Sequence, residues 1–358
     1  MRPKDITVTP AGRRSYIEIL VPYLLANRAH IDEHHFWVNT KSGGDIAYLQ
    51  SLAQQHPDFF KLKRRPVHDR WRPCDSIWHY FQDYVEDETV YIRFDDDICY
   101  IAPEAIPRLV ACRVAEREPF LIFGNIVNNS ICSYIQQRRG LLPRSWGKVK
   151  KICKDRVGWA RGRFAARVHR LFLEDIRSGN VARWEFPREL LPDYDRFSIN
   201  VICWFGHDLK GLPELSIPNL YTENVTHPLT GEEIDDEEST LTEYFPAKFA
   251  RPCLICGDAV FGHFAYFTQR PYLEFFTNIL DDYYNVVHPA RALAESEVRS
   301  ESLANWWRVL SRRNLRHEMW RAAFPKIADW RDKMLKQREQ RQNAAATTNA
   351  APPVVSSQ

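Results

Sequence analysis

Three consecutive aspartates, Asp95-Asp96-Asp97, directly follow residues 89–94, which give the strongest strand signal in the chain. In an extended backbone alternate side chains point to the same side, so the carboxylates of Asp95 and Asp97 would face one ion. Oxygen ligands of this kind bind Mg²⁺ or Mn²⁺, usually together with the oxygens of a diphosphate. The triplet therefore predicts a divalent metal site that also holds a phosphate-bearing ligand.

The elements that would position this triplet are four strands separated by three helices. Short apolar runs that indicate strands are separated by segments with helical spacing: strands at 6–9, 35–40, 59–62 and 89–94, and helices at 15–27, 45–55 and 74–84. This alternation predicts an α/β fold with a mostly parallel central sheet flanked by helices. Such sheets bind ligands beyond the carboxyl ends of their strands, which is where the triplet lies.

This arrangement resembles the GT-A fold of nucleotide-sugar-dependent glycosyltransferases, which carry a D-x-D motif at the end of the fourth strand. The motif here is Asp95-Asp96-Asp97, within the segment Val90-Tyr91-Ile92-Arg93-Phe94-Asp95-Asp96-Asp97-Ile98. The resemblance covers roughly residues 5–110. It implies a divalent ion, Mn²⁺ or Mg²⁺, that bridges Asp95 and Asp97 to the diphosphate of a nucleotide-sugar donor.

Two later features follow in the order that this resemblance implies. The run Asp235-Asp236-Glu237-Glu238-Ser239-Thr240-Leu241 is similar to the acidic element at the head of an acceptor-side helix. In inverting members one such acid is the general base, and the spacing to Leu241 leaves Asp236, Glu237 and Glu238 all open as that base. His263, within an apolar segment, corresponds to a late histidine that serves as a further metal ligand.

The resemblance also implies contacts with the donor. Arg13, in the loop Thr9-Pro10-Ala11-Gly12-Arg13-Arg14 after the first strand, would reach the phosphates through its charged fork of donors. Asn39 ends the second strand, and Asp75 lies near the head of the third helix. These two residues occupy places where the family contacts base and ribose, and Asp96 is expected to contribute to donor binding as well.

Composition excludes several other classes. The 358 residues carry 49 Lys+Arg against 46 Asp+Glu, a net charge of +3, which argues against bulk nucleic acid as the main partner. The cysteines lie at irregular spacing in apolar runs, which predicts reduced, buried thiols, and the lone Cys253-Leu254-Ile255-Cys256 pair is expected to be two core thiols. We see neither a signal peptide nor a membrane-spanning run, so a cytoplasmic protein is expected.

Two basic segments need a separate explanation. Residues 136–170 hold twelve Lys/Arg and one acid, Asp155, and residues 301–341 combine several tryptophans with an Arg/Lys excess. Either segment could contact an anionic surface or nucleic acid, or its cations could simply be solvated. We expect a donor half at 1–110, an acceptor half at 111–290, a helical C-terminal extension at 291–342 and a disordered tail at 343–358.

The sequence thus predicts a metal-dependent glycosyltransferase that moves a sugar from a nucleotide-sugar donor to a glycan or another acceptor hydroxyl. P-loop, dinucleotide-glycine and G-x-S-x-G patterns are absent, so the corresponding classes lack their motifs. Two alternatives remain. One is a nucleotidyltransferase, for which Gly12 alone is a poor substitute for a glycine-rich loop. The other is a non-catalytic carbohydrate- or nucleic-acid-binding protein on a similar scaffold.

Overall fold

The structure, a computed structural model, describes residues 3–65, 73–212, 225–231, 233–234 and 236–289, apart from the side chains of 73–76, 225 and 233. The chain divides into two compact units, Met1–His288 and Pro289–Gln358, and all elements described below belong to the first. The expected helical extension at 291–342 and the tail at 343–358 lie outside the described residues, as does Asp235. The boundary between the two expected halves stays a prediction.

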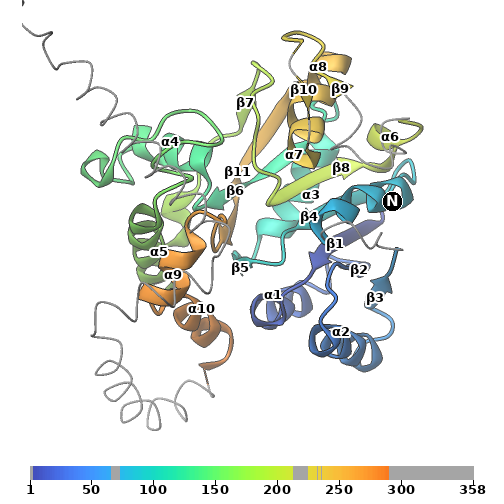
Figure 1. Ribbon diagram of the computed structural model, residues 1–358, viewed down its shortest axis with the longest axis horizontal. Coiled ribbons are helices and arrows are strands. Elements are labelled where there is room, and N and C mark those ends of the chain that lie inside the picture. The colour runs from blue at the N-terminus through green and yellow to red at the C-terminus, as the bar shows by residue number, and fades with distance from the viewer. Residues whose placement is uncertain (1–2, 66–72, 213–224, 232, 235, 290–358) are drawn as a thin grey trace, which may run out of the picture. The chain divides into compact units, whose positions relative to one another are not determined.

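The predicted alternation of strands and helices at the N-terminus is confirmed (Figure 1). In chain order the elements are β1 Asp5–Ala11, α1 Arg14–Ala26, β2 Glu33–Val38, α2 Gly43–Gln55, β3 Phe60–Lys63, η1 Pro73–Asp83 and β4 Val90–Phe94. One element differs from expectation, because η1 is a 3₁₀ helix rather than an α-helix. Apolar residues three and four positions apart are compatible with both helix types, so spacing alone could not separate them.

The central sheet has nine strands among the described residues, in the order β3-β2-β1-β4-β8-β6-β11-β5, with β7 beside β11. Its later strands are β5 Ile98–Ile101, β6 Ile122–Val127, β7 Glu189–Leu191, β8 Val201–Phe205 and β11 Cys253–His263. Six of these strands run in one direction: β1, β2, β3, β4, β6 and β11. The other three, β5, β7 and β8, run in the opposite direction. The expected mostly parallel sheet is therefore confirmed, with an antiparallel strand, β8, at its centre.

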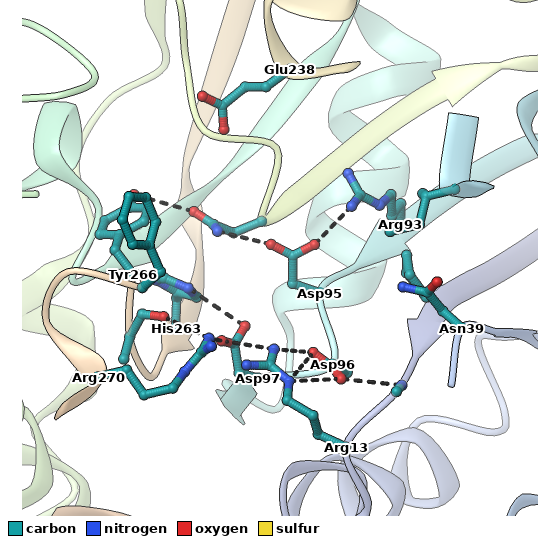
Figure 2. A pocket seen from close by; sticks show the side chains of 16 residues that line it. Arg13, Asn39, Arg93, Asp95, Asp96, Asp97, Glu238, His263, Tyr266 and Arg270 are labelled. Atoms are coloured by element: carbon teal, nitrogen blue, oxygen red, sulfur yellow. Dashed lines mark hydrogen bonds and ion pairs between the residues drawn. The ribbon is translucent and has the colours of Figure 1, made fainter. Parts of the chain in front are cut away.

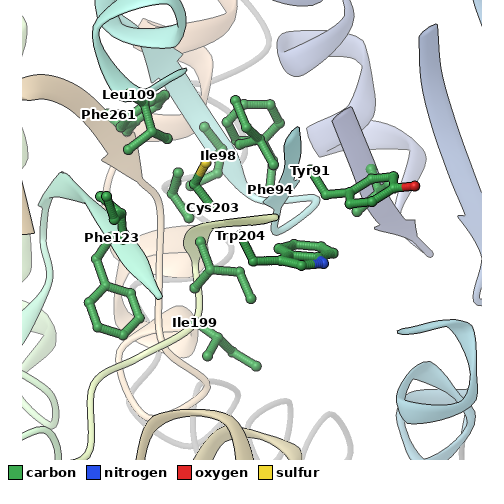
Figure 3. Packing of buried hydrophobic residues seen from close by; sticks show 14 of the residues in the cluster. Tyr91, Phe94, Ile98, Leu109, Phe123, Ile199, Cys203, Trp204 and Phe261 are labelled. Carbon is green, nitrogen blue, oxygen red and sulfur yellow. The ribbon is translucent and has the colours of Figure 1, made fainter. Parts of the chain in front are cut away.

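The core of the sheet is rich in aromatic side chains. Figure 3 shows Tyr91, Phe94, Phe123, Trp204 and Phe261 in one buried cluster that joins β4, β6, β8 and β11. Every residue of β4 is buried, as expected for a strand covered on both faces. Helix α3 Ala105–Ala115 packs against β6, β8 and β11, and α1 packs against β5.

A second cluster of buried side chains forms where α5 Gly162–Arg177 meets α9 Arg270–Phe276 and α10 Ile279–Val287. The other elements are short or peripheral: α4 Ser130–Arg138, η2 Arg144–Trp146, η3 Val181–Trp184, α6 Gly206–Leu209, β9 Val225–Thr226, β10 Glu233–Ile234, α7 Glu237–Ser239, the π-helical turn η5 Thr240–Tyr244 and α8 Phe245–Phe249. Because α7, η5 and α8 follow one another without a break, they form one continuous helical segment.

The described cysteines are all buried, and none forms a disulfide. Cys253 and Cys256 lie three residues apart on β11, so their side chains point to opposite faces of the sheet and cannot share an ion. This agrees with the expectation of two core thiols. Within the described part of the chain, no helix is both long and apolar enough to cross a membrane.

Candidate active site

The candidate site lies at the carboxyl edge of the sheet. β1, β2, β4 and β11 run in the same direction, so the residues that follow them meet there: Gly12 and Arg13, Asn39, the aspartate triplet (Asp95, Asp96 and Asp97), and His263 at the end of β11. The central strand β8 runs the opposite way. Its antiparallel direction brings Asn200, the residue before it, to the same edge.

The aspartate triplet is not extended, which corrects the alternation argument. Asp96 and Asp97 form a turn, closed by a hydrogen bond of 3.2 Å from the Ile98 N–H to the Asp95 carbonyl oxygen. The chain must turn there because it leaves β4 and enters β5, which runs in the opposite direction and pairs with β11 at the edge of the sheet. The carboxylates of Asp95 and Asp97 nevertheless converge, and one ligand atom from each, together with one from His263, lies within 4.8 Å of the others (Figure 2).

His263 reaches this group through an irregularity in β11. The pairing of β11 with β5 shifts register between Gly262 and His263, and such a bulge re-aims a side chain. The imidazole Nε2 lies 3.5 Å from Oδ1 of Asp97. Its Nδ1 is buried and has no hydrogen-bond partner among the described residues, although buried polar atoms are normally paired.

Two carboxylates and one imidazole with a free nitrogen form a donor set that suits a divalent ion. The oxygen ligands are those that Mg²⁺ and Mn²⁺ prefer, and the added nitrogen is more typical of a transition metal than of Mg²⁺. The residues present therefore fit the expected metal.

Three arginines surround the triplet. Oδ2 of Asp97 accepts hydrogen bonds or ion pairs from Arg270 at 3.0 Å and Arg13 at 3.1 Å, which leaves Oδ1 facing His263. Burial alone would raise the pKa of Asp97, but the charges of Arg13, His263 and Arg270 outweigh it and lower that pKa to about 2. This carboxylate is therefore ionised, and it keeps one oxygen available for a cation.

The neighbouring carboxylates have different partners. Asp95 pairs with Arg93 at 2.9 Å and accepts a hydrogen bond of 2.9 Å from the Asn200 amide. Asp96 accepts from the Arg13 guanidinium and, at 3.2 Å, from the Gly12 N–H, so it ties the loop after β1 to the end of β4. Burial raises the pKa of Asp96, and Arg13 opposes that rise. Asp96 therefore has a structural role here besides its expected place beside the donor.

A cavity of about 470 Å³ opens beside the triplet, a volume typical of small-molecule sites. Its lining residues come from every strand end named above: Pro10, Gly12, Arg13, Asn39, Ile77, Arg93, Asp95, Asp96, Asp97, Asn200, Glu238, His263, Ala265, Tyr266, Phe267 and Arg270. Gly12 permits the close approach of two of these strand ends, because a Cβ there would lie 2.9 Å from the Asn39 carbonyl oxygen.

Among the expected donor contacts, Arg13 and Asn39 line the cavity. Oδ1 of Asn39 is buried without a hydrogen-bond partner among the described residues, so it can accept a hydrogen bond from a ligand. Asp75 belongs to η1, which also supplies Ile77 to the cavity wall, but the Asp75 side chain lies outside the described residues.

The acidic run Asp236, Glu237 and Glu238 begins the helical segment at α7, as expected. Oδ1 of Asp236 caps this segment by accepting a hydrogen bond of 2.7 Å from the Ser239 N–H. Arg196 holds both neighbours of Glu237, with contacts of 2.6 Å to Asp236 and 2.6 Å to Glu238. Glu238 alone of the three lines the cavity, and Figure 2 shows its carboxylate above the triplet.

Glu237 is held in a different environment. Its side chain is 16% exposed, and Oε1 lies 3.4 Å from Nη1 of the buried Arg93. Burial raises the pKa of Glu237 to about 7, against the opposing charge of Arg93. Burial would also raise the pKa of Asp236, but Arg196 and the capping hydrogen bond lower it below its ordinary value.

The segment after β11 is fixed by buried polar groups. Asn128, in the left-handed conformation with φ 66°, donates to the Phe264 carbonyl oxygen and to Oε1 of Gln269, each at 2.9 Å. Burial lowers the pKa of His169 to about 3, so its neutral ring donates from Nε2 to the same carbonyl oxygen at 2.8 Å and accepts from Tyr283. These contacts set the position of the cavity-lining residues Ala265 and Tyr266.

Several site residues were not predicted from the sequence: Arg93, Asn200, Arg196, Tyr266 and Arg270. A signal existed for Arg93, because a charged residue inside a run of buried apolar residues must pair with another buried charge. Nothing in the local sequence distinguishes the others, since their partners lie far away along the chain.

No protein-family model and no curated protein sequence matches this chain. Among solved structures, it is similar to a glucosyl-3-phosphoglycerate synthase from Mycobacterium tuberculosis in complex with Mn²⁺, UDP and glucosyl-3-phosphoglycerate, with 11% identity over 50% of this chain and 67% of that one and a TM-score of 0.28. The same enzyme with phosphoglyceric acid gives 11% identity, the same coverage and a TM-score of 0.29.

A 4-diphosphocytidyl-2C-methyl-D-erythritol synthase is also similar, with 10% identity and a TM-score of 0.27. That match covers 34% of this chain and 59% of the other, so the chain spans less than two thirds of that structure's length. Similarities at this level assign neither an activity nor a substrate to this chain.

Proposed function

We propose that this chain is a metal-dependent glycosyltransferase that moves a sugar from a nucleotide-sugar donor to an acceptor hydroxyl. The observation that carries the proposal is the group formed by Asp95, Asp97 and His263 in a cavity at the carboxyl edge of a mostly parallel sheet. The metal expected there is Mn²⁺ or Mg²⁺. When bound, it would act as a Lewis acid on the leaving diphosphate.

The charge balance of the site favours a metal and a diphosphate together. The three aspartates of the triplet contact three guanidinium groups, those of Arg13, Arg93 and Arg270. Since these charges already offset one another, a divalent cation alone would leave the site positive. A nucleoside diphosphate supplies the missing negative charge, and guanidinium groups bind phosphate oxygens well. The donor and the metal should therefore strengthen each other's binding.

Different walls of the cavity would hold different parts of the donor. Arg13, from the loop after β1, and Arg270, from α9, both contact Oδ2 of Asp97 and line the cavity, so either can turn a guanidinium donor toward the diphosphate. Nε of Arg270 is buried without a hydrogen-bond partner among the described residues, so this group has an N–H to offer. Pro10, Ile77 and the free oxygen of Asn39 form the wall on which we place the nucleoside.

We propose that Glu238 is the base that takes the proton from the acceptor hydroxyl. Asp236 caps a helix and is bound to Arg196, and Glu237 points to Arg93, whereas Glu238 faces the cavity. One oxygen of Glu238 accepts from Arg196 at 2.6 Å and from Cys153 at 3.5 Å, while Oε2 has no hydrogen-bond partner among the described residues. That free oxygen can accept the proton of an attacking hydroxyl, which is the role of a base in an inverting transfer.

The test is thermal stability of the full chain against a panel of nucleoside diphosphates and nucleotide sugars, with and without Mn²⁺. Stabilisation by one donor that requires the metal is expected, and a concentration of 100 times Kd would add about 2.7 kcal/mol. Asp97→Asn should abolish the shift, while Asp58→Asn, at a side chain 69% exposed and outside the cavity, should retain it. A folded protein that responds to no donor would contradict the proposal.

Product analysis separates the two enzymatic alternatives. A glycosyltransferase releases a nucleoside diphosphate from the donor, whereas a nucleotidyltransferase releases inorganic pyrophosphate from a nucleoside triphosphate. Both activities use a metal and phosphate groups, so the released product decides between them. Release of pyrophosphate would contradict the proposal and favour a nucleotidyltransferase. A donor that binds in the presence of metal but is never consumed, with any acceptor hydroxyl supplied, would favour the non-catalytic binding protein.

A further inference from the structure

A strongly basic surface lies beside the candidate site. Every lysine and arginine from 138 to 170 is exposed except Lys151, which is half-buried. We call the exposed ones the basic surface: Arg138, Arg139, Arg144, Lys148, Lys150, Lys154, Arg156, Arg161, Arg163, Arg167 and Arg170. Three of them, Arg163, Arg167 and Arg170, follow the 3–4 spacing that places them on one face of α5.

The cations of the basic surface are not neutralised locally. None of them forms an ion pair with an acid in the described part of the chain, whereas Lys151 lies 3.8 Å and 3.9 Å from Asp193 and Asp195. The one acid within the segment, Asp155, is buried, and its carboxylate accepts hydrogen bonds from the backbone N–H groups of Lys150, Val157 and Gly158. The positive charge therefore faces solvent.

Three large apolar side chains are exposed around the same segment: Ile152 at 50%, Phe267 at 63% and Phe276 at 54%. Ile152 lies among the lysines themselves. Phe267 contacts Trp159 with ring centroids 5.1 Å apart. Phe276 stacks on Tyr272, which in turn packs against Gly162 at the start of α5. Exposed apolar groups thus lie within the basic segment and on residues that pack against it, and exposed apolar groups gathered in this way indicate a contact surface.

This surface adjoins the cavity. Trp159 packs on Tyr266 with ring centroids 6.0 Å apart, and both Tyr266 and Phe267 line the cavity. From the same segment, the Cys153 thiol donates to Glu238 at 3.5 Å. A partner that covers the basic surface would therefore reach the side of the cavity where Glu238 lies.

We propose that the basic surface docks on a membrane that contains anionic lipids. The cations contact lipid phosphates and carboxylates, and Ile152, Phe267 and Phe276 enter the boundary between headgroups and acyl chains. Nucleic acid would also attract the cations and could stack on phenylalanine, but an exposed isoleucine among lysines has no base or phosphate to bind and does have a place in lipid. Docking would present the cavity to a hydroxyl carried at the membrane surface.

The experiment is sedimentation of the full chain with vesicles of phosphatidylcholine alone and of phosphatidylcholine mixed with phosphatidylserine. Binding to the mixed vesicles that weakens as salt rises is expected, with little binding to the neutral ones. Reversal of three charges, Lys148→Glu, Lys150→Glu and Lys154→Glu, should lower partitioning by at least about tenfold, because each reversal replaces an attraction to the anionic surface with a repulsion.

A matched triple, Lys4→Glu, Lys63→Glu and Arg64→Glu, changes the net charge equally at exposed positions outside the basic surface and should bind as the wild type does. Ile152→Ser with Phe276→Ser tests the apolar contribution and should weaken binding without changing its salt dependence. Each variant's thermal unfolding confirms that it folds.

Three outcomes would overturn the docking proposal: equal binding to neutral vesicles, equal loss in the two charge triples, or binding to a single-stranded oligonucleotide that exceeds binding to the mixed vesicles. Asp97→Asn separates this proposal from the proposed activity, since that variant should lose donor binding and still sediment with vesicles as the wild type does.

Discussion

The aspartate triplet and the acidic run at 236–238 contain the same kind of side chain in threes, yet the structure uses them in opposite ways. Arginines from three elements, β4, α9 and the loop after β1, surround the triplet, and its carboxylates converge with His263. In the acidic run one arginine, Arg196, binds the first and third residues, while the second is turned toward Arg93.

The consequence is seen in the pKa values. Burial acts on both Asp97 and Glu237, but Asp97 is bound by Arg13 and Arg270 and its pKa falls to about 2, whereas Glu237 has only Arg93 against three neighbouring acids and its pKa rises to about 7. Burial raises the pKa of both carboxyl groups, and the charged neighbours, cations at Asp97 and mostly acids at Glu237, decide which way each pKa moves. One cluster is a candidate site for a cation, and the other holds carboxyl groups of unequal acidity near the cavity.

Asp97→Asn should have the largest effect in either cluster. It removes the negative charge that would bind a cation and that pairs with Arg13 and Arg270, so metal-dependent turnover should fall by roughly 10³-fold or more, on the scale of several kcal/mol. Turnover with Mn²⁺, at the donor concentration that saturates the wild type, measures the loss, with Asp58→Asn as the control. Turnover within tenfold of wild type would mean that the triplet holds no catalytic metal.

Glu238→Gln should reduce turnover by about 10²–10⁴-fold while donor binding stays intact, because a general base acts on the acceptor and not on the donor. Glu237→Gln, one position away and outside the cavity, should cost far less. Single-turnover rates and donor affinity for the two variants check this difference. If Glu237→Gln proved the more damaging, the base would be the residue with the raised pKa.

Stability should respond to pH through Glu237. Its pKa is about 7 in the folded chain and about 4.5 in the unfolded chain, so between these values the folded state binds more protons and stability falls as pH rises. The total fall is at most about 3 kcal/mol. Glu237→Gln should therefore gain stability relative to the wild type between pH 4.5 and pH 8, measured by denaturant unfolding, while the exposed Glu88→Gln should show no such gain. Parallel curves for wild type and Glu237→Gln would show that Glu237 is already ionised at low pH.

We expect the smallest effect, on stability, from substitutions at Asp236. Asp236→Ala removes the cap on the Ser239 N–H and should cost about 1 kcal/mol of stability, while Asp236→Asn keeps a capping oxygen and should cost less. Both variants should retain turnover within a few-fold, since this side chain does not line the cavity. A large loss of turnover in Asp236→Asn would show that its charge matters to the reaction.

The sequence alone predicts those strands and helices whose signals are local. The first four strands and the intervening helices follow from spacing and turn residues, and the triplet lies at the strand end where it was expected. The candidate metal group was proposed from the order of D-x-D and a late histidine, and the structure places those three side chains together. The local backbone of the triplet was not foreseen, because a turn into β5 requires knowing that β5 pairs with β11.

Contacts between distant residues could not be predicted. Asn200 bonds to Asp95 across 105 positions, and Arg270 bonds to Asp97 across 173. Neither residue stands in a motif, and both reach the site only because β8 runs antiparallel and because α9 follows β11. The apolar run at 201–205 indicates a strand but carries no information about its neighbours or its direction.

The same central strand has a consequence for folding. β8 pairs with β4 on one side and β6 on the other, and β11 pairs with β5 and β6, so the middle of the sheet consists of pairings between segments far apart along the chain. Closing such loops is entropically costly and slows folding relative to chains with local contacts. The N-terminal strands can pair early, whereas the cavity exists only after β8 and β11 have joined them. During refolding, metal-dependent donor binding should therefore return after most of the secondary structure has formed.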